Sequence, residues 1–210
     1  MIRVYLVDDH AVVRAGFRSM LEAEADITVV GEASSGVEAY SHYLDLQPDV
    51  VVTDISMPGE GGLGFMRRLL KRDHNARVLV MSMFDDVAFV KRAMEYGAMG
   101  YISKSDDPGL LVQAIRSVAA GNTWVAPMLA QEMLRSMRSS EASPQDLLTD
   151  REFEVFVLLA SGKDAKEIAD ILHLSPKTVG THQTRIYNKL RLNTGAELAR
   201  LAIRLNIINA

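Results

Sequence analysis

Val50-Val51-Val52-Thr53 is a short apolar run that ends at the acidic residue Asp54. Runs of this length and composition are typical of strands buried on both faces of a parallel sheet. The run Val4-Tyr5-Leu6-Val7 has the same build and ends at Asp8 and Asp9. Because ligands of an open parallel sheet bind beyond the carboxyl ends of its strands, we expect these three carboxylates to meet at one edge.

Two later runs place a hydroxyl and an ammonium group at the same edge. Val78-Leu79-Val80-Met81 ends at Ser82, and Gly100-Tyr101-Ile102-Ser103 ends at Lys104. Each polar residue alone has a plain explanation, such as a turn, a helix N-cap or a surface lysine. Together, each at the end of an expected strand, they favour one pocket with three carboxylates, a hydroxyl and an ammonium.

Apolar residues recur at helical spacing between these runs, as Phe17, Met20 and Leu21 do after the first strand. With a further strand at Ile27–Val30, five strands alternate with five helices. This alternation predicts an α/β doubly wound, five-stranded parallel sheet over residues 1–128. The expected strand order is the flavodoxin-like 2-1-3-4-5.

A second domain is expected at residues 147–210, joined to the first by residues 129–146. The joining segment reads as a helix from Met128 to Arg138 followed by a small, polar linker at Ser139–Pro144. The second domain reads as a small all-α bundle of four helices. The short turn at His173-Leu174 between two of them gives the spacing of a helix-turn-helix unit.

Local signals mark the starts of these helices. Thr149-x-x-Glu152 is a capping box before an apolar run. Ser175-Pro176 combines an N-cap with proline at the first helical position. The helix that follows is expected to turn Val179 and Ile186 inward and its polar side outward.

The composition of the 210-residue chain excludes several kinds of protein. It has no cysteine, which rules out disulfides, thiolate metal sites and thiol catalysis. No apolar run approaches the roughly 18 residues of a membrane span, and strand-like sequence begins by Ile2. We therefore expect no membrane segment, no signal peptide and a cytoplasmic location.

The net charge of −4 is unevenly distributed. Residues 1–128 carry 12 basic and 17 acidic side chains, whereas residues 149–210 carry 9 basic and 7 acidic ones. The window between Asp170 and Glu197 contains no acidic residue. Its basic residues are Lys177, Arg185, Lys189 and Arg191. A basic stretch of this kind in an acidic protein predicts a binding site for a polyanion.

The carboxylates suit a magnesium-dependent phosphoryl acceptor. Mg²⁺ prefers hard oxygen ligands, which Asp8, Asp9 and Asp54 offer. Once the metal offsets their repulsion, Asp54 can attack a phosphoryl group and form an aspartyl-phosphate. Positioning and neutralisation of the phosphoryl oxygens do most of the catalytic work. Lys104 can neutralise one of these oxygens as a point charge, and Ser82 can donate a hydrogen bond to another.

Residues 1–128 resemble the receiver domain of two-component response regulators. The matching positions are Asp8-Asp9, Asp54, Met57-Pro58-Gly59, Ser82, Tyr101 and Lys104. The resemblance implies that a sensor histidine kinase phosphorylates Asp54 and that the backbone carbonyl of Ser56 completes the magnesium shell. It also implies that Ser82 and Tyr101 are a switch pair, in which the ring turns inward as the hydroxyl moves toward the phosphoryl group.

Residues 149–208 resemble the LuxR-type helix-turn-helix, and the whole chain resembles the NarL/FixJ class of response regulators. The matching residues are Leu148-Thr149, Arg151-Glu152, Gly162, Lys166-Glu167-Ile168-Ala169, Ser175-Pro176-Lys177-Thr178-Val179, Thr181-His182, Ile186 and Lys189-Leu190. The resemblance makes the helix after Ser175 a recognition helix for double-stranded DNA.

Contacts to DNA can be assigned along this helix, whose amino-terminal half contacts base edges. We expect Thr181 and Thr184 at base edges or thymine methyl groups, and Arg185 at a guanine. The other expected contacts, mainly to phosphates, come from Lys177, Thr178, His182 and Lys189. Gly180 is in the same set and departs from the family, which often has a long side chain there. A glycine costs about 1 kcal/mol against alanine in a helix interior.

A homodimer is the expected active form. A module with so little net positive charge needs two copies on paired half-sites for useful affinity. The family dimerises through the last helix of this domain. In this chain that helix contains Leu198, Leu201, Ala202 and Leu205. Burial of this stripe within one monomer is the alternative explanation.

The sequence thus predicts a phosphorylation-dependent transcription regulator of a two-component system, and not an enzyme. One alternative is a regulator that binds DNA constitutively with a vestigial receiver. Another is a magnesium-dependent aspartyl phosphatase, which would want an acid/base Asp where Ser56 stands. A dinucleotide-binding enzyme is excluded by the lack of Gly-x-Gly-x-x-Gly after the first strand.

Overall fold

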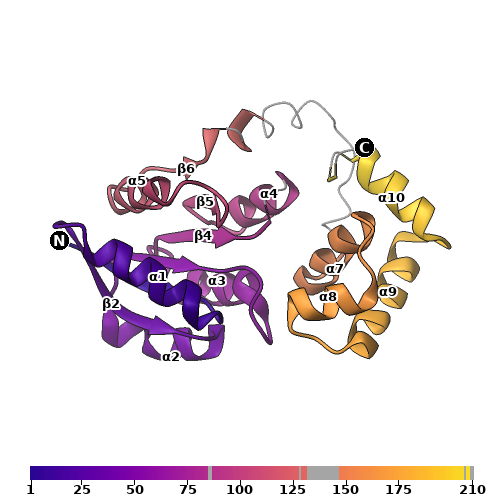
Figure 1. The fold of residues 1–210 in the computed structure, drawn as a ribbon, viewed down its shortest axis with the longest axis horizontal. Helices are drawn as coiled ribbons and strands as arrows, with labels where there is room; N and C mark the ends of the chain where they lie inside the picture. Colours follow the sequence, from indigo (N-terminus) through magenta and orange to yellow (C-terminus); the bar gives the residue numbers. More distant parts are fainter. Residues whose placement is uncertain (85–86, 128, 132–146, 206, 209–210) are drawn as a thin grey trace. The chain divides into compact units, whose positions relative to one another are not determined.

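The computed structural model describes residues 1–84, 87–127, 129–131, 147–205 and 207–208. These residues form two compact units, one from nearly all of residues 1–130 and one mainly from residues 131–210 (Figure 1). Of the helix expected from Met128 to Arg138, residues 129–131 are described and are helical. The expected linker at Ser139–Pro144 lies outside the described residues.

The first unit alternates strands and helices. Its elements are β1 (Ile2–Val7), α1 (Ala11–Glu22), β2 (Ile27–Ala33), α2 (Gly36–Leu46), β3 (Val50–Thr53), α3 (Gly61–Arg72), β4 (Val78–Ser82), α4 (Val87–Glu95), β5 (Gly100–Ser103), α5 (Pro108–Ala119) and β6 (Trp124–Val125). The strands are all parallel, in the order β2-β1-β3-β4-β5-β6.

The order of the first five strands confirms the predicted parallel sheet, and a short sixth strand that was not predicted extends it. The sixth, β6, has two residues and pairs with β5 through Trp124 opposite Gly100 and Val125 opposite Tyr101. So short a run carries no periodicity from which a strand could be recognised.

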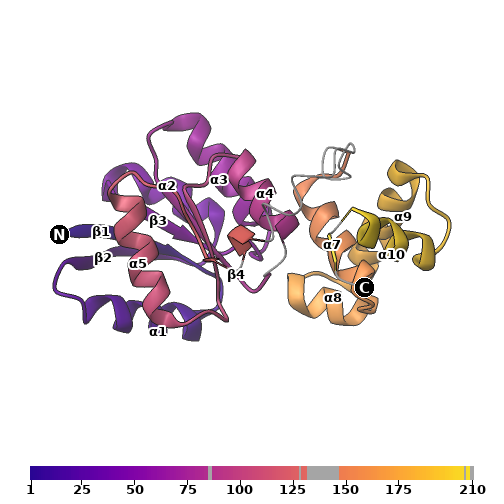
Figure 2. The same ribbon diagram turned by 90° about the horizontal axis from the view of Figure 1, so that it is seen from above.

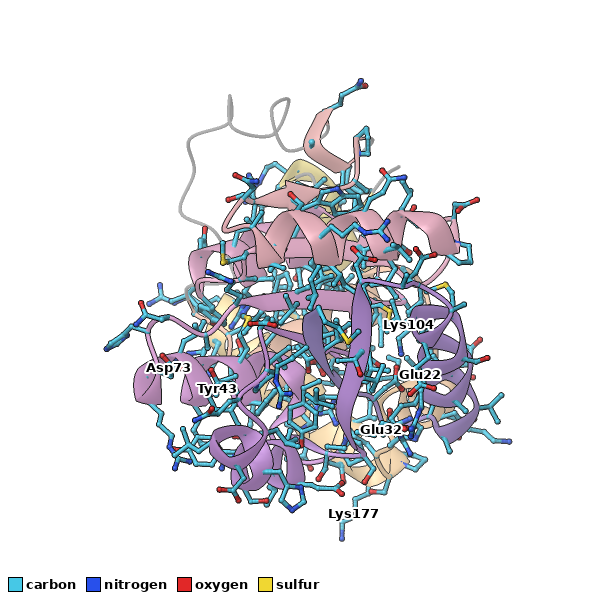
Figure 3. All side chains as sticks on the ribbon, turned by 90° about the vertical axis from the view of Figure 1, so that its left-hand side faces the viewer. Glu22, Glu32, Tyr43, Asp73, Lys104 and Lys177 are labelled. Carbon is cyan, nitrogen blue, oxygen red and sulfur yellow. The ribbon has the colours of Figure 1, made fainter. Side chains whose placement is uncertain are left out.

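The sheet is buried on both sides by helices, as Figure 2 shows. Every residue of β3, β4 and β5 is buried, which explains their continuous apolar sequence. Leu21 of α1 and Ile115 of α5 belong to one apolar cluster with strand residues such as Leu79. On α2, Tyr43 donates a hydrogen bond of 2.6 Å to Asp73 at the end of α3, which holds these helices together (Figure 3).

The second unit consists of four described helices, as predicted. They are α7 (Asp150–Ala160), α8 (Ala165–Leu172), α9 (Pro176–Leu190) and α10 (Gly195–Arg204). The expected capping box begins α7, since Thr149 accepts from the Glu152 amide and Glu152 accepts from the Thr149 amide. Ser175 caps α9 as expected, and a further capping box, formed by Asp164 and Glu167, begins α8.

Candidate functional site

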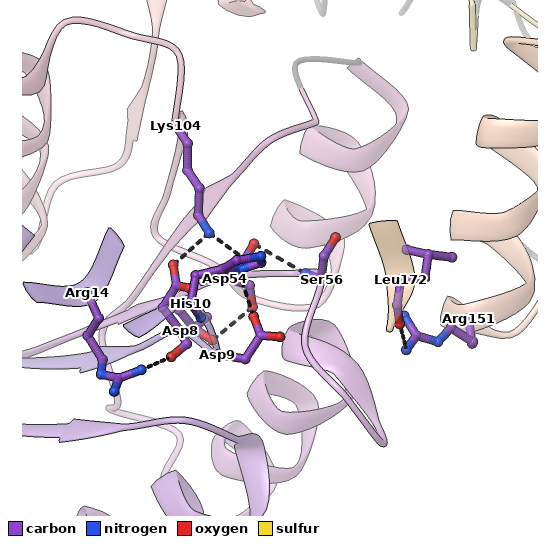
Figure 4. A network of polar contacts seen from close by, with 10 residues as sticks. Asp8, Asp9, His10, Arg14, Asp54, Ser56, Lys104, Arg151 and Leu172 are labelled. Carbon is purple, nitrogen blue, oxygen red and sulfur yellow. Dashed lines mark hydrogen bonds and ion pairs between the residues drawn. The ribbon is translucent and has the colours of Figure 1, made fainter. Parts of the chain in front are cut away.

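The carboxyl ends of β1, β3 and β5 bring three charged side chains into contact. Lys104 Nζ lies 2.6 Å from Asp8 Oδ2 and 2.7 Å from Asp54 Oδ2 (Figure 4). Asp9 lies beside them, and His10 Nδ1 is 3.0 Å from Asp9 Oδ1. The side chains at these strand ends therefore lie together as expected, although the roles assigned to them stay predictions.

This site is almost completely buried. The side chains of Asp8, Asp54 and Lys104 are 2%, 1% and 5% exposed. Burial, together with repulsion from Asp8, raises the pKa of Asp54, although the adjacent ammonium of Lys104 acts in the opposite direction. Burial alone would lower the pKa of Lys104, but the two carboxylates outweigh it and raise that pKa. Lys104 therefore keeps its charge and partly offsets the local excess of carboxylates.

The backbone around Asp54 holds its carboxylate in a fixed place. The Asp54 amide donates to the Val7 carbonyl at 2.9 Å, and the Ser56 amide donates to Asp54 Oδ1 at 3.2 Å. The Gly62 amide, at the start of α3, donates to the Ile55 carbonyl at 2.8 Å. A Cβ atom at Gly62 would lie 1.7 Å from the Asp54 carbonyl oxygen, so only glycine allows this approach. Gly62 was not predicted as part of the site, since nothing in the local sequence pattern marks it.

The side chains present fit a divalent cation. Asp8, Asp9, His10 and Asp54 each offer a ligand atom, and these atoms lie within 4.8 Å of one another. Ser56 Oγ is buried beside them with no hydrogen-bond partner among the described residues, so a polar atom remains available to a ligand or its water. Carboxylate oxygens of this kind suit Mg²⁺. His10 was missed in the sequence analysis, although it directly follows the acidic pair.

The two expected switch residues are both bonded to Phe84, which follows β4. The Phe84 amide donates to Ser82 Oγ at 3.2 Å. The Tyr101 hydroxyl donates to the Phe84 carbonyl at 2.6 Å. Ser82 and Tyr101 are both fully buried. Ser82 and Tyr101 are therefore linked through the backbone of one residue, and their role as a switch pair stays a prediction.

The outer face of α9 carries the residues expected to contact DNA. Those that are exposed are Lys177, Thr181, Thr184, Arg185 and Lys189, whereas Thr178, Gly180 and His182 are partly buried. Val179 and Ile186 are fully buried, as expected. Lys189 Nζ donates to the buried Glu152 Oε2 at 2.6 Å, so this residue has an internal partner, and its expected contact with a DNA phosphate stays a prediction. Burial and the nearby Arg151 lower the pKa of His182, which favours its neutral form.

The expected dimer stripe on α10 is corrected in part. Leu198 and Ala202 are 1% and 0% exposed, because α10 packs against α7 within the same unit. They belong to the interior and offer no surface to a partner. Leu201 and Leu205 are partly buried, so their role in a dimer stays a prediction.

Among the described residues, we find no helix with the length and apolar character that crossing a bilayer requires.

Family models match both units. Residues 4–116 match the response regulator receiver domain, and residues 146–202 match the bacterial regulatory proteins of the luxR family. The chain is 40% identical to the response regulator GacA of Pseudomonas viridiflava, with 100% of this chain and 99% of GacA covered. It is 39% identical to the response regulator UvrY of Escherichia coli strain K12, with 100% and 97% covered.

Solved structures agree. A LuxR-family two-component response regulator from Aurantimonas sp. SI85-9A1 is 41% identical, with a TM-score of 0.64 over 66% of this chain and 99% of that one. The response regulator ChrA of a heme-sensing two-component system is 35% identical, with a TM-score of 0.53 over 99% of this chain and 98% of that one. The chain therefore belongs to the NarL/FixJ class of two-component response regulators, which combine a receiver domain with a LuxR-type helix-turn-helix domain.

Proposed function

We propose that this protein is a phosphorylation-dependent, DNA-binding transcription regulator, that Asp54 is its phosphoryl acceptor and that a sensor histidine kinase is the donor. The observation that carries the proposal is the position of Lys104 Nζ, within 2.6 Å of Asp8 and 2.7 Å of Asp54 at the carboxyl edge of the sheet. The proposed domains are residues 1–128 and 147–210, joined by 129–146. A regulator of this class acts where the chromosome lies, so we place it in the cytoplasm.

The proposed transfer uses groups already held in place. An oxygen of Asp54 forms a bond to phosphorus as the bond between phosphorus and the kinase's histidine nitrogen breaks, and the electron pair returns to that nitrogen. Lys104 neutralises a phosphoryl oxygen, and the Ser56 amide keeps the carboxylate oriented. Mg²⁺, held by Asp8, Asp9, Asp54 and the Ser56 carbonyl, would supply charge neutralisation for the remaining phosphoryl oxygens.

Phosphorylation changes the charge near the switch pair. The phosphoryl group adds about −1.5 to −2 charges and strong acceptor oxygens. Ser82 can then donate to a phosphoryl oxygen, and its bond from the Phe84 amide must adjust. Tyr101 is bonded to the same residue, so the adjustment reaches a large buried ring. We propose that this shift changes how often the DNA-binding domain or the dimer surface is available.

The proposed DNA-binding surface is the outer face of α9. The proposed DNA-bound form is a homodimer whose interface includes Leu201 and Leu205. The acid-free stretch from residue 171 to residue 196 supports a polyanionic target. The acidic cluster supports regulation over the alternative of a vestigial receiver. The alternative of an aspartyl phosphatase is disfavoured, because Ser56 stands where that enzyme needs a second acid/base Asp.

The test uses the full chain, acetyl phosphate and Mg²⁺. Wild-type protein should incorporate one phosphoryl group by intact mass, and binding to DNA fragments selected from a random pool should become tighter. If Asp54→Ala still gained the mass of a phosphoryl group, the assignment of Asp54 as the acceptor would be refuted. Equal DNA affinity with and without the phosphodonor would instead favour the constitutive binder.

A further inference from the structure

Gly180 occupies a place in α9 where no contact among the described residues requires a glycine. It lies in the interior of the helix Pro176–Leu190, and its φ angle is not positive. A Cβ atom built at Gly180 would meet no atom within 4 Å. Alanine would therefore fit and would favour the helix. The packing of the described residues therefore does not account for the glycine.

Two threonines border Gly180 on the exposed face, and their hydroxyl hydrogens are already used. Thr184 Oγ1 donates to the Gly180 carbonyl at 3.0 Å, and Thr181 Oγ1 donates to the Lys177 carbonyl at 3.1 Å. These bonds fix the threonine rotamers and leave their methyl groups and hydroxyl lone pairs for an external partner. We call the open space at Gly180, next to Thr181 and Thr184, the notch; neither threonine brings a free side-chain donor to it.

We propose that this notch receives the C5-methyl group of a thymine in the major groove, which makes Gly180 a specificity-determining residue. The inference rests on the proposed DNA binding through α9. Thymine is the base that presents a methyl group in the major groove, whereas guanine presents two acceptors that need a donor. The notch offers apolar contact and open space, so it fits the methyl group. Donors for other bases come from outside the notch, from Lys177 or Arg185.

The experiment uses phosphorylated full-length protein and a DNA site that it selects from a random pool. Each thymine of a half-site is replaced in turn by uracil, which removes the methyl group and keeps the base pairing. Loss of one buried methyl group, about 0.8 kcal/mol, corresponds to roughly fourfold weaker binding. We expect this penalty at one thymine per half-site. In a DNA site where cytosine replaces that thymine, methylation of the cytosine at C5 should tighten protein binding by a similar factor.

Gly180→Ala should fill the notch and remove the difference between thymine and uracil. It should also raise the thermal midpoint of the helical domain by roughly 4–8 °C, because alanine favours the helix. The matched control is Gly16→Ala, since Gly16 lies in α1 and a Cβ atom there also meets nothing within 4 Å. Gly16→Ala should leave the uracil penalty unchanged.

Several results would overturn the inference. They are the absence of a uracil penalty at every thymine, a penalty that persists in Gly180→Ala, and a uniform loss of affinity in Gly180→Ala with the thymine-to-uracil ratio unchanged. Each of these leaves the proposed DNA binding intact. A phosphorylated wild-type protein that selects no DNA at all would overturn the proposed function, and this inference with it.

Discussion

The carboxyl edge of the sheet and the outer face of α9 are built on opposite principles. At the sheet edge, Asp8, Asp54 and Lys104 are 2%, 1% and 5% exposed and hold one another by ion pairs. On α9, Thr181 and Thr184 are exposed, and their hydroxyl groups bond to their own helix. Buried charges are costly to leave unpaired, whereas exposed side chains can change with little loss of stability. Substitutions at the first region should therefore alter folding and chemistry together, whereas those at the exposed threonines of the second should alter recognition with little effect on folding.

The largest effect is expected for Asp54→Asn. This change keeps the size of the side chain and removes the nucleophilic carboxylate, so phosphate incorporation from acetyl phosphate should be lost completely. Intact mass spectrometry measures it directly. Asp45→Asn is the control, because Asp45 is exposed on α2, and it should incorporate phosphate like the wild type. Equal loss in both variants would contradict the assignment of Asp54.

Lys104→Met tests how strongly the sheet edge depends on its one ammonium. Without Lys104, the buried Asp8 and Asp54 lose their cationic partner, and the free energy of unfolding should fall by about 3–5 kcal/mol. Urea unfolding followed by the fluorescence of Trp124, the single tryptophan, reports on this unit. Added Mg²⁺ should stabilise the variant more than the wild type, because a cation bound by the carboxylates replaces the lost charge. A variant as stable as the wild type without Mg²⁺ would show that the ion pairs contribute nothing net.

Gly62→Ala tests the close approach of α3 to the end of β3. The added Cβ atom would overlap the Asp54 carbonyl oxygen at 1.7 Å, so the start of α3 must move. Such overpacking costs about 1–3 kcal/mol, and the displaced Asp54 backbone should also slow phosphorylation. Trp124 fluorescence in urea and the rate of label incorporation measure the two effects. Unchanged stability and rate would mean that the loop relaxes without cost. Gly16→Ala serves as the control, since a Cβ atom there has open space.

Gly62 also marks the limit of what could be predicted from the sequence. The strand ends at Asp8, Asp54 and Lys104 were predictable, because continuous apolar runs reveal buried parallel strands and strand ends share one edge. The close approach of Gly62 to Asp54 depends on the path of the loop between β3 and α3, which no periodicity encodes. The two-residue strand β6 was not predicted either, because so short a run has no periodicity.

On the helical side, caps and inward faces were predictable from local sequence. The competition between the interior and the dimer surface was not, because an apolar stripe on α10 looks the same in either case. Burial of Leu198 and Ala202 assigns those two residues to the interior. The bond between Lys189 and Glu152 was likewise hidden, since its partners are 37 residues apart.

Glu152→Gln should give the smallest effect. In the helical domain it tests the ion pair between the buried Glu152 and Lys189, whose side chain is 38% exposed. Burial opposes ionisation of Glu152, but the bonds from Lys189 and Thr149 outweigh it and lower its pKa from the usual value of a glutamate. The variant should lose about 1–2 kcal/mol at pH 7, measured by native-state hydrogen exchange of α7 and α9 amides. A carboxylate whose pKa is lower in the folded state stabilises the fold at any pH above its unfolded-state pKa. This stabilisation is lost as pH falls through the folded-state pKa. The gap between wild type and variant should therefore close below pH 4.5. A gap that persists unchanged to about pH 3 would show that charge is not its cause. Asp170→Asn, an exposed change on α8, should show no gap at either pH.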